Sequence, residues 1–435
     1  MSHHRNLEIK ASALALLPLL VFLSLFVGVG TILHLQKVEF AFYQLPAPIA
    51  ILPAIVLALY LSKERLNDAI EQFLKGMGNS NIMTMCLIYL LAGAFSAVSS
   101  ASGGVDVVVN LALHAVPSWF LLPGFFIVSG LIATAMGTSM GTIAAVAPIA
   151  LGLAQSAGIE PVYMAGAVLG GAMFGDNLSI ISDTTIAATR TQGCDMKDKF
   201  RQNVFIALPA ALVTILLLFA LGQSTPIATA PIENWYNALP YLAILILALS
   251  GMNVFVVLFS GTLLAGAFAG LSMDYSALQW GKDIYQGFSN MQEIFLLSLF
   301  VGGLSELMRR QGGLAFIQAW VGNKVNKARN PSRAAQFGIA LITGLTNIGV
   351  ANNTVAILVS GDLTRQMATD YKIQPARSAS LMDIFACVVQ GLIPYGAQAL
   401  LLGSLFSLSP VQVISASWYP MILALLAIYS IYRKS

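Results

Sequence analysis

Two carboxylates stand close together in a long apolar segment and are the residues best suited to chemistry. Asp176 and Asp183 lie seven residues apart within 166–190, whose sequence is GAVLGGAMFGDNLSIISDTTIAATR. Seven residues are close to two turns of a helix, which would place both carboxylates on one face. Gly175 and the sequence Asn-Leu-Ser nevertheless indicate that the helix unwinds between them.

An ionised carboxylate in such a segment must be paired, hydrated or bound to a cation, because its removal from water is costly. Amide and hydroxyl oxygens surround both aspartates, and with the carbonyls of an unwound helix they suit a small cation such as Na⁺. Each carboxylate can take up a proton instead, so we predict that Na⁺ and H⁺ compete for Asp176 and Asp183. The neighbouring oxygen donors complete the predicted site: Asn177, Ser179, Ser182, Thr184 and Thr185.

A simpler interpretation of these aspartates stays open at this point. They could lie at the end of a membrane span, where they are solvated or cap a helix. The sequence Asp183-Thr184-Thr185 fits such a cap.

Three further segments combine helix-breaking and polar residues, and they predict a cavity for a substrate. Residues 136–148 (MGTSMGTIAAVAP), 343–357 (TGLTNIGVANNTVAI) and 383–398 (DIFACVVQGLIPYGAQ) each place glycine or proline beside hydroxyl or amide groups. A break in a helix leaves backbone amides and carbonyls able to face a substrate. Packing of small residues between helices is the alternative for the first segment. The predicted lining is Thr138, Ser139, Thr142, Thr346, Asn347, Asn352, Asn353, Thr354, Gln390, Tyr395 and Gln398.

Two other acidic residues lie near basic ones. Asp383 stands either within a span or at its cytoplasmic end beside Arg377, and the sequence leaves this open. Glu306 is predicted to pair with Arg309 and Arg310 on one face of a helix rather than to bind an ion.

The composition places all of these segments in a membrane protein. Apolar residues make up 57% of the 435 positions and charged residues 9%, with a mean hydropathy of +0.79, whereas a soluble chain carries about 25% charged residues. Apolar runs of about 20 residues recur, long enough to cross a membrane as helices, and they lack the alternation of β-barrel strands. The sequence therefore predicts an all-α polytopic membrane protein. Because no ATP-binding, dinucleotide or metalloprotease motif is present, we expect neither enzyme activity nor a cofactor.

The basic residues orient the predicted spans. Segments 119–155 and 334–364 are predicted to be re-entrant hairpins or pairs of short crossings, each returning to the side it left. Segments 162–189 and 378–408 are predicted to be single crossings broken in the middle. With the N-terminus in the cytoplasm, every Lys and Arg except Lys37 and Lys282 falls on the cytoplasmic side, as the positive-inside rule requires. This places Lys199 in a cytoplasmic loop and both termini in the cytoplasm. We expect the protein in the plasma (inner) membrane. The remaining expected spans are 12–33, 44–61, 80–101, 203–222, 237–250, 252–271, 289–308 and 412–431.

The chain also resembles itself. Gly78 and Gly103-Gly104 recur in order as Gly287 and Gly312-Gly313, and the sequence TSMG recurs as TNIG. The loop after the first copy of this pattern lacks basic residues, whereas the loop after the second copy is rich in them. The two copies should therefore insert with opposite orientation, as in transporters built from inverted repeats.

This repeat divides the chain into two predicted halves. The first half is 1–222 and contains repeat one over about 80–222. The second half is 223–435 and contains repeat two over about 289–431. We expect interrupted helices and re-entrant hairpins in each.

The segments around the aspartates resemble a known signature. GTSMGTIAAVAPIALG and the segment 166–190 are similar to the pattern GTSxGT followed by GDxxSPxSDTT, which is typical of the NhaC-type sodium/proton antiporters of the ion transporter superfamily. This chain is a compact version and has Ile180 where the pattern often has proline. The resemblance implies a Na⁺ and H⁺ role for Asp176 and Asp183. Related members exchange organic acids or carry amino acids.

Together these features predict a secondary active transporter, foremost a Na⁺/H⁺ antiporter that works by alternating access. The alternative is a Na⁺- or H⁺-coupled transporter of an amino acid or small organic acid. An ion channel is less favoured, because an inverted repeat within one chain is typical of a carrier. The expected partners are membrane lipid and a small ion or small polar substrate, without nucleic acid. A homodimer is left open.

Overall fold

The computed structural model describes residues 10–38, 41, 44–221, 238–272 and 275–433, and over these residues it consists of helices joined by short turns, without strands. Seven helical segments are long and apolar enough to cross a membrane. The bent pair α15 (Ala277–Asn290) and α16 (Gln292–Arg310), which meet at 44°, passes the same test as one unit. The chain is therefore an all-α, multi-pass membrane protein, as predicted. The seven segments are Ala13–Leu33, Ser80–Ala101, Ser118–Met136, Ser139–Ser156, Pro161–Gln192, Met196–Leu221 and Val254–Leu271.

The helices of the first half occur in this order: α1 (Leu17–Leu23), α2 (Val29–Leu35), α3 (Ala47–Ala50), α4 (Leu52–Leu61), α5 (Leu66–Met77), α6 (Ser80–Ala101), α7 (Gly104–Ala115), α8 (Leu121–Met136), α9 (Ser139–Ser156), α10 (Pro161–Leu178), α11 (Asp183–Gln192) and α12 (Met196–Leu221). The second half continues with α13 (Leu239–Leu249), α14 (Val254–Ser272), α15, α16, α17 (Gly313–Asn326), α18 (Pro331–Val350), α19 (Asn353–Asp370), α20 (Pro375–Gln390), α21 (Ala397–Phe406), α22 (Pro410–Ser415) and α23 (Trp418–Arg433).

All four predicted breaks are present, and local chemistry explains each. α8 ends at Gly137, whose φ of 70° suits glycine, and the chain turns at once into α9. α18 ends in the same way at Ala351, with a φ of 52°, before α19. α10 and α11 are separated by residues 179–182, and α20 and α21 by the segment 391–396, which contains Pro394.

The two halves share an order of elements. α7 and α17 each follow a glycine with positive φ, Gly103 and Gly312. α10 and α20 each begin with a proline in the first turn, where its missing N–H costs nothing. Breaks α8–α9 and α10–α11 thus recur as α18–α19 and α20–α21.

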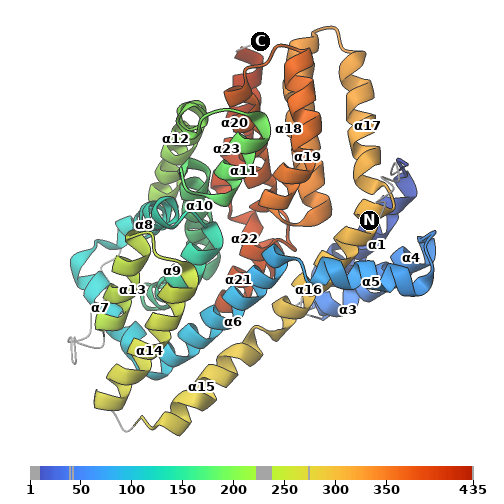
Figure 1. Ribbon diagram of the computed structural model, residues 1–435. Coiled ribbons are helices and arrows are strands. Elements are labelled where there is room, and N and C mark those ends of the chain that lie inside the picture. Colours follow the sequence, from blue (N-terminus) through green and yellow to red (C-terminus); the bar gives the residue numbers. More distant parts are fainter. Residues whose placement is uncertain (1–9, 39–40, 42–43, 222–237, 273–274, 434–435) are drawn as a thin grey trace, which may run out of the picture.

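Glycine contacts hold helices of the two halves together. A side chain at Gly287 of α15 would collide with the backbone of Gly93 in α6, and one at Gly76 of α5 would meet Gly302 of α16. Thus α15 of the second half packs on α6 of the first half, and α5 of the first half packs on α16 of the second half. Figure 1 shows α6 and α15 running side by side.

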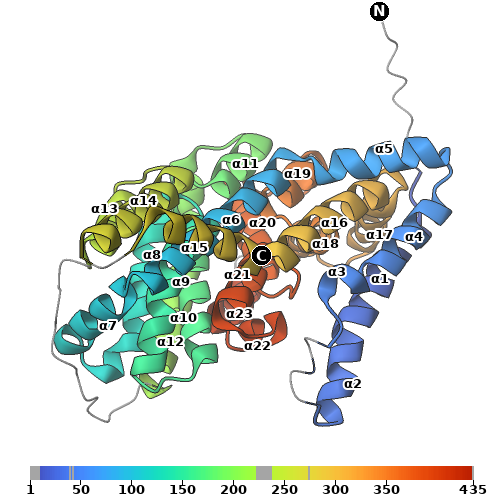
Figure 2. The same cartoon turned by 90° about the horizontal axis from the view of Figure 1, so that it is seen from below.

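The arrangement leaves the broken helices in the middle of the molecule. Helices α1–α4 lie at one end and α7, α13 and α14 at the other, with α10, α20 and α21 between them (Figures 1 and 2). The largest apolar core is continuous across both halves, since it includes Leu169 and Leu401. Irregular backbone at membrane depth is tolerated only where it is buried in protein or lines a water-filled cavity, so a position inside the bundle suits these breaks.

Some predicted boundaries were wrong. The predicted span 203–222 starts earlier, because α12 begins at Met196 and draws Lys199 into the protein; Lys199 is buried, not a loop residue. The predicted span 289–308 is the second part of the bent pair α15–α16, which begins at Ala277. Predicted spans 44–61 and 237–250 correspond to the shorter helices Ala47–Leu61 and Leu239–Leu249, the latter preceded by residues outside the described part.

The glycine contact between α6 and α15 can be tested by adding a methyl group. Gly287→Ala should lower the free energy of unfolding by about 1–3 kcal/mol, because the helices are forced apart. Gly281→Ala is the matched control on the same helix, where nothing lies within 4 Å of the added methyl, and it should stabilise by about 0.4–1 kcal/mol. Thermal unfolding in detergent measures both, and equal melting temperatures would contradict the contact.

Candidate cation and substrate site

Three of the four breaks and the end of α20 meet at one small polar cavity of about 90 Å³. Its wall includes the turn between α8 and α9, the start of α11, the turn between α18 and α19, and α20–α21. α6 closes it with Asn81 and Thr84, two polar residues that the sequence analysis missed. Predicted residues that line the cavity are Thr138, Ser139, Asp176, Ser182, Asp183, Thr184, Asn352, Asn353, Thr354, Gln390 and Gln398.

Asp176 is the buried carboxylate of this cavity, with 6% of its surface exposed. Ser182 Oγ donates to Asp176 Oδ1 at 2.5 Å and Ser139 Oγ donates to Oδ2 at 2.9 Å. Ser182 also contacts the hydroxyl of Thr184 at 2.9 Å. Both donors come from breaks, Ser139 from the first turn of α9 and Ser182 from the linker before α11, so Asp176 is held by the interrupted geometry itself.

Close helix packing positions Asp176. A side chain at Gly175 would run into Gly130 and Ala133 of α8, so α10 and α8 approach with little between them. Ser179 Oγ donates to the carbonyl of Thr134 at 2.8 Å and satisfies a backbone group near the end of α8. The last turn of α10 is therefore anchored on both sides of Asp176.

Asp183 occupies a different environment. It is the first residue of α11, and its side chain is exposed although it reaches the cavity wall. A carboxylate in the first turn of a helix is favoured by the helix dipole. The two aspartates thus lie at one cavity but differ in burial, which their spacing alone does not reveal.

Polar contacts tie the two halves together across the cavity. Gln398 Nε2 donates to Ser139 Oγ at 3.0 Å, and Gln390 Nε2 donates to Gln398 Oε1 at 2.9 Å. This chain of hydrogen bonds links α9 of the first half to α20 and α21 of the second half. A movement of one half against the other would have to break it.

Three helices also begin at this cavity. Thr138 caps α9 through Gly141 N at 3.4 Å, and Asn352 caps α19 through Val355 N at 2.9 Å, while α11 begins at Asp183. Each helix N-terminus presents unpaired N–H groups and a partial positive charge. The cavity therefore offers carboxylates for a cation and helix starts for an anion.

A second polar cluster lies beside Asn177, the residue after Asp176 on α10, and contains a fully buried ion pair. Lys199 Nζ is 2.6 Å from Asp383 Oδ2, and both side chains are 1% exposed. Asn177 and Asn203 each donate to the same carboxylate oxygen at 2.8 Å. Asp383 is therefore inside a helix bundle and not beside Arg377 at a solvated helix end.

Lys199 and Asn203 are site residues that the sequence analysis missed. They are four residues apart on α12 and continue the buried stripe of Ala207, Ala210 and Thr214 toward its N-terminus. Extending that period of the helix backward would have revealed them. The charged neighbours at 197, 198 and 201 concealed the stripe.

Several predicted residues hold the structure around the cavity instead of lining it. Asn177 joins the Asp383 cluster, and Thr185 Oγ1 donates to Ser179 O at 2.7 Å. Asn347 donates to Ala386 O at 2.8 Å, and Tyr395 donates to Ile348 O at 2.7 Å. Thr142 donates to Thr138 O at 2.9 Å, Ser179 bonds α8, and Thr346 is buried without a hydrogen-bond partner for its hydroxyl.

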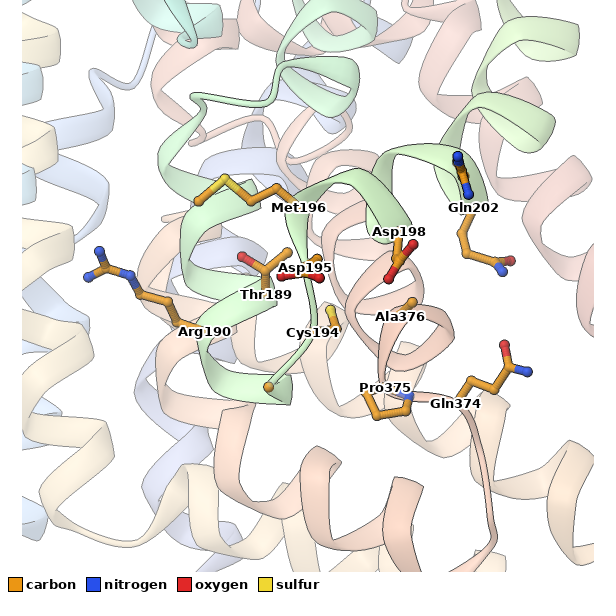
Figure 3. A pocket seen from close by; sticks show the side chains of 12 residues that line it. Thr189, Arg190, Cys194, Asp195, Met196, Asp198, Gln202, Gln374, Pro375 and Ala376 are labelled. Atoms are coloured by element: carbon orange, nitrogen blue, oxygen red, sulfur yellow. The ribbon is translucent and has the colours of Figure 1, made fainter.

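A larger hollow of about 870 Å³ lies at the other end of α11 and contains none of the predicted site residues. Figure 3 shows Cys194, Asp195 and Asp198 where α11 turns into α12, across from Pro375 and Ala376 at the start of α20. Glu306 lies in neither place and pairs with Arg309 at 2.6 Å and Arg310 at 3.2 Å, as predicted.

Interrupted helices that meet at a polar cavity inside a multi-pass bundle are the features of a secondary active transporter. The chain belongs to the Na⁺/H⁺ antiporter family, whose model matches residues 7–223 and 224–433. This confirms the resemblance found from the signature around Asp176.

Named relatives agree with this membership. The chain is 25% identical to the Na⁺/H⁺ antiporter NhaC of Bacillus subtilis, over 79% of this chain and 81% of the relative. It is 24% identical to the NhaC of Alkalihalophilus pseudofirmus, over 86% and 87%. It is also 24% identical to a malate-2H⁺/Na⁺-lactate antiporter of Bacillus subtilis, over 92% of both chains. The protein is therefore a secondary active transporter of an antiporter family.

The N-cap of α19, Asn352, gives a test of the cavity wall. Asn352→Ala should lower the free energy of unfolding by about 1 kcal/mol, because α19 loses the acceptor for its first turn, whereas Asn352→Ser should keep most of it. Thermal unfolding of the purified variants measures the difference. If alanine and serine behaved alike, Asn352 would not act as a cap.

Proposed function

We propose that this protein exchanges Na⁺ for H⁺ by alternating access, with Asp176 as the group that holds either ion. The observation that supports this most is the position of Asp176: a buried carboxylate in a polar cavity, bonded by hydroxyls from two helix breaks. Membership of an antiporter family is consistent with it.

The surroundings of Asp176 explain how one group serves both ions. Hydroxyls can donate or accept hydrogen bonds, so Ser139 and Ser182 can donate to the bare carboxylate and turn their lone pairs toward a cation when one binds. A proton on Asp176 removes most of its attraction for Na⁺. The two ions then exclude each other, and crossing the membrane with the site neutral avoids the cost of an exposed charge.

Asp183 has a supporting part in this proposal. Its exposed carboxylate at the cavity wall attracts cations toward Asp176 and contributes an oxygen ligand when Na⁺ is bound. Because it is exposed, its loss should weaken binding of Na⁺ without removing the exchange. Ser182, Thr184 and backbone carbonyls of the linker 179–182 are the other proposed ligands.

Alternating access is proposed to use the two halves as inverted repeats. The recurrence of breaks, glycine turns and initial prolines supports a repeat, and the distribution of basic residues supports its inversion, with both termini in the cytoplasm and the protein in the plasma membrane. The cross-half hydrogen bonds of Gln398 and Gln390 would change between the two states. Na⁺ and H⁺ are the proposed transported ions.

A second candidate function is coupled exchange of a small carboxylate or amino acid. The convergence of three helix N-termini on the cavity favours it, because these suit a substrate carboxylate. The side-chain amides of Asn353 and Gln390 in the same wall add hydrogen-bonding groups. A relative named as a malate-2H⁺/Na⁺-lactate antiporter is consistent with it.

Removal of the Asp176 charge tests the main proposal. Asp176→Asn should reduce sodium-dependent proton flux in proteoliposomes by at least about tenfold, because the amide neither titrates nor attracts Na⁺ strongly. Asp183→Asn should raise the Na⁺ concentration for half-maximal flux, with less effect on the maximum. In the parent, Na⁺ affinity should increase as pH rises, since deprotonation frees the carboxylate.

Glu306→Gln is the control, because Glu306 pairs with arginines outside the cavity, and it should retain most of the flux. Asp176→Asn with flux and pH profile like the parent would remove Asp176 from the coupling site. Uptake of labelled lactate, malate and amino acids by the same liposomes separates the second candidate, which requires substrate uptake driven by a Na⁺ or H⁺ gradient.

A further inference from the structure

Four charged side chains are buried within the described residues: Asp176, Lys199, Arg377 and Asp383. Lys199 and Asp383 neutralise each other as an ion pair. Arg377 donates to Gln336 at 3.0 Å and to Ser430 at 2.9 Å, and it forms no ion pair with a carboxylate of the described residues. Around α10, Asp176 is thus the buried charge without a cationic partner, and one monovalent cation or proton would neutralise it.

Lys199 occupies a site made of oxygen atoms. Its ammonium contacts Asp383 Oδ2 at 2.6 Å, Asn177 O at 3.0 Å and Thr185 Oγ1 at 2.7 Å, so each of its three N–H groups has an acceptor. A carboxylate, a carbonyl at a helix end and a hydroxyl are the donor types that also bind Na⁺ in transporters with interrupted helices.

The two oxygens of the Asp383 carboxylate differ in their hydrogen bonds. Asp383 Oδ2 accepts from Lys199, Asn177 and Asn203, while Oδ1 is buried and has no partner. The side-chain oxygen of Asn203 is also buried and unpaired. Two buried oxygens without donors are unusual, and they leave acceptor capacity for a cation.

The two sites are joined through one turn of α10. Asp176 faces the cavity and bonds Ser139 and Ser182, while the next residue, Asn177, donates to Asp383. Lys199 also bonds Thr185 beyond the linker 179–182, so its side chain bridges the same helix break that shapes the cavity.

We propose that Asp383 with Asn177, Asn203 and Thr185 is a second monovalent-cation site, which Lys199 fills with its own ammonium. Lys199 thereby limits the transported cation to the one that neutralises Asp176. This rests on the proposed role of Asp176 in Na⁺ binding and adds a determinant of stoichiometry. Removal of the ammonium leaves Asp383 bare, and two cations are then needed before the charges around α10 are neutral.

Lys199→Met tests this, because it keeps an unbranched side chain one atom shorter than lysine and deletes the charge. In proteoliposomes the parent should show a Hill coefficient for Na⁺ of about 1, and Lys199→Met a coefficient approaching about 2, because two sites must fill before transport. The double variant Lys199→Met with Asp383→Asn lacks both charges and should return to the parent's coefficient. Lys197→Met, an exposed lysine on the same helix, is the matched control.

Stability in detergent gives an independent measurement. Na⁺ should raise the melting temperature of Lys199→Met more than that of the double variant, and N-methyl-D-glucamine chloride at equal ionic strength should not. A purely structural ion pair predicts destabilised Lys199→Met with no Na⁺-specific recovery.

The outcomes are separable. If the parent has no sodium-dependent flux, the proposed function fails and this inference falls with it. If the parent is sodium-dependent but Lys199→Met keeps its coefficient or gains no Na⁺-specific stability, only the second site is overturned. Failure of Lys199→Met to accumulate in sodium medium, while the double variant accumulates, also overturns it, since Na⁺ should replace the missing ammonium.

Discussion

The constraint on which this structure depends is that no charge or broken helix end can face hydrocarbon without a partner. Asp176 lies beside such a break, and neighbouring polar groups form hydrogen bonds with its carboxylate and with the backbone near it. Hydroxyls of Ser139 and Ser182 bond its carboxylate, and Ser179 bonds a carbonyl near the end of α8. The helices that carry these breaks, α10, α20 and α21 among them, lie between the two ends of the bundle (Figure 1).

Close packing makes this placement possible. Transmembrane helices gain little from excluding lipid, so they associate through small residues that let backbones approach. Gly175 against Gly130 brings α10 onto α8, and Gly93 against Gly287 brings α6 onto α15. The first contact orients Asp176, and the second joins the two halves. The position of Asp176 in the cavity therefore depends on glycines that have no functional group of their own.

The two buried carboxylates, Asp176 of α10 and Asp383 of α20, have different partners. Asp383 is neutralised inside the protein by Lys199 at 2.6 Å, whereas Asp176 is in no ion pair within the described residues and accepts from the hydroxyls of Ser139 and Ser182. Breaking a buried pair leaves an uncompensated charge and costs about 3–5 kcal/mol, so we expect the pair to persist. The hydroxyls that bond Asp176 carry no charge, and its own charge therefore stays without a counter-charge. Asp383 thus has a permanent counter-charge in Lys199, whereas Asp176 can be neutralised by an ion that binds and leaves.

The class of structure, the four breaks and most of the cavity wall could be predicted from the residues alone, because these features follow from local properties. Long apolar runs predict membrane helices. Gly137 and Pro394 end helices and Asn352 caps one through properties of the residues themselves, whatever packs against them. Which polar groups come into contact could not be predicted in this way and follows from how the helices pack. From the sequence Lys199 is predicted to be a loop residue, but in the structure α12 packs on α10 and α20 and buries it. The sequence also gives Asp183 the same role as Asp176, whereas the structure leaves the side chain of Asp183 exposed at the start of α11. Pairing and burial depend on neighbours distant in the chain, and such contacts are not encoded in the spacing of residues along one helix.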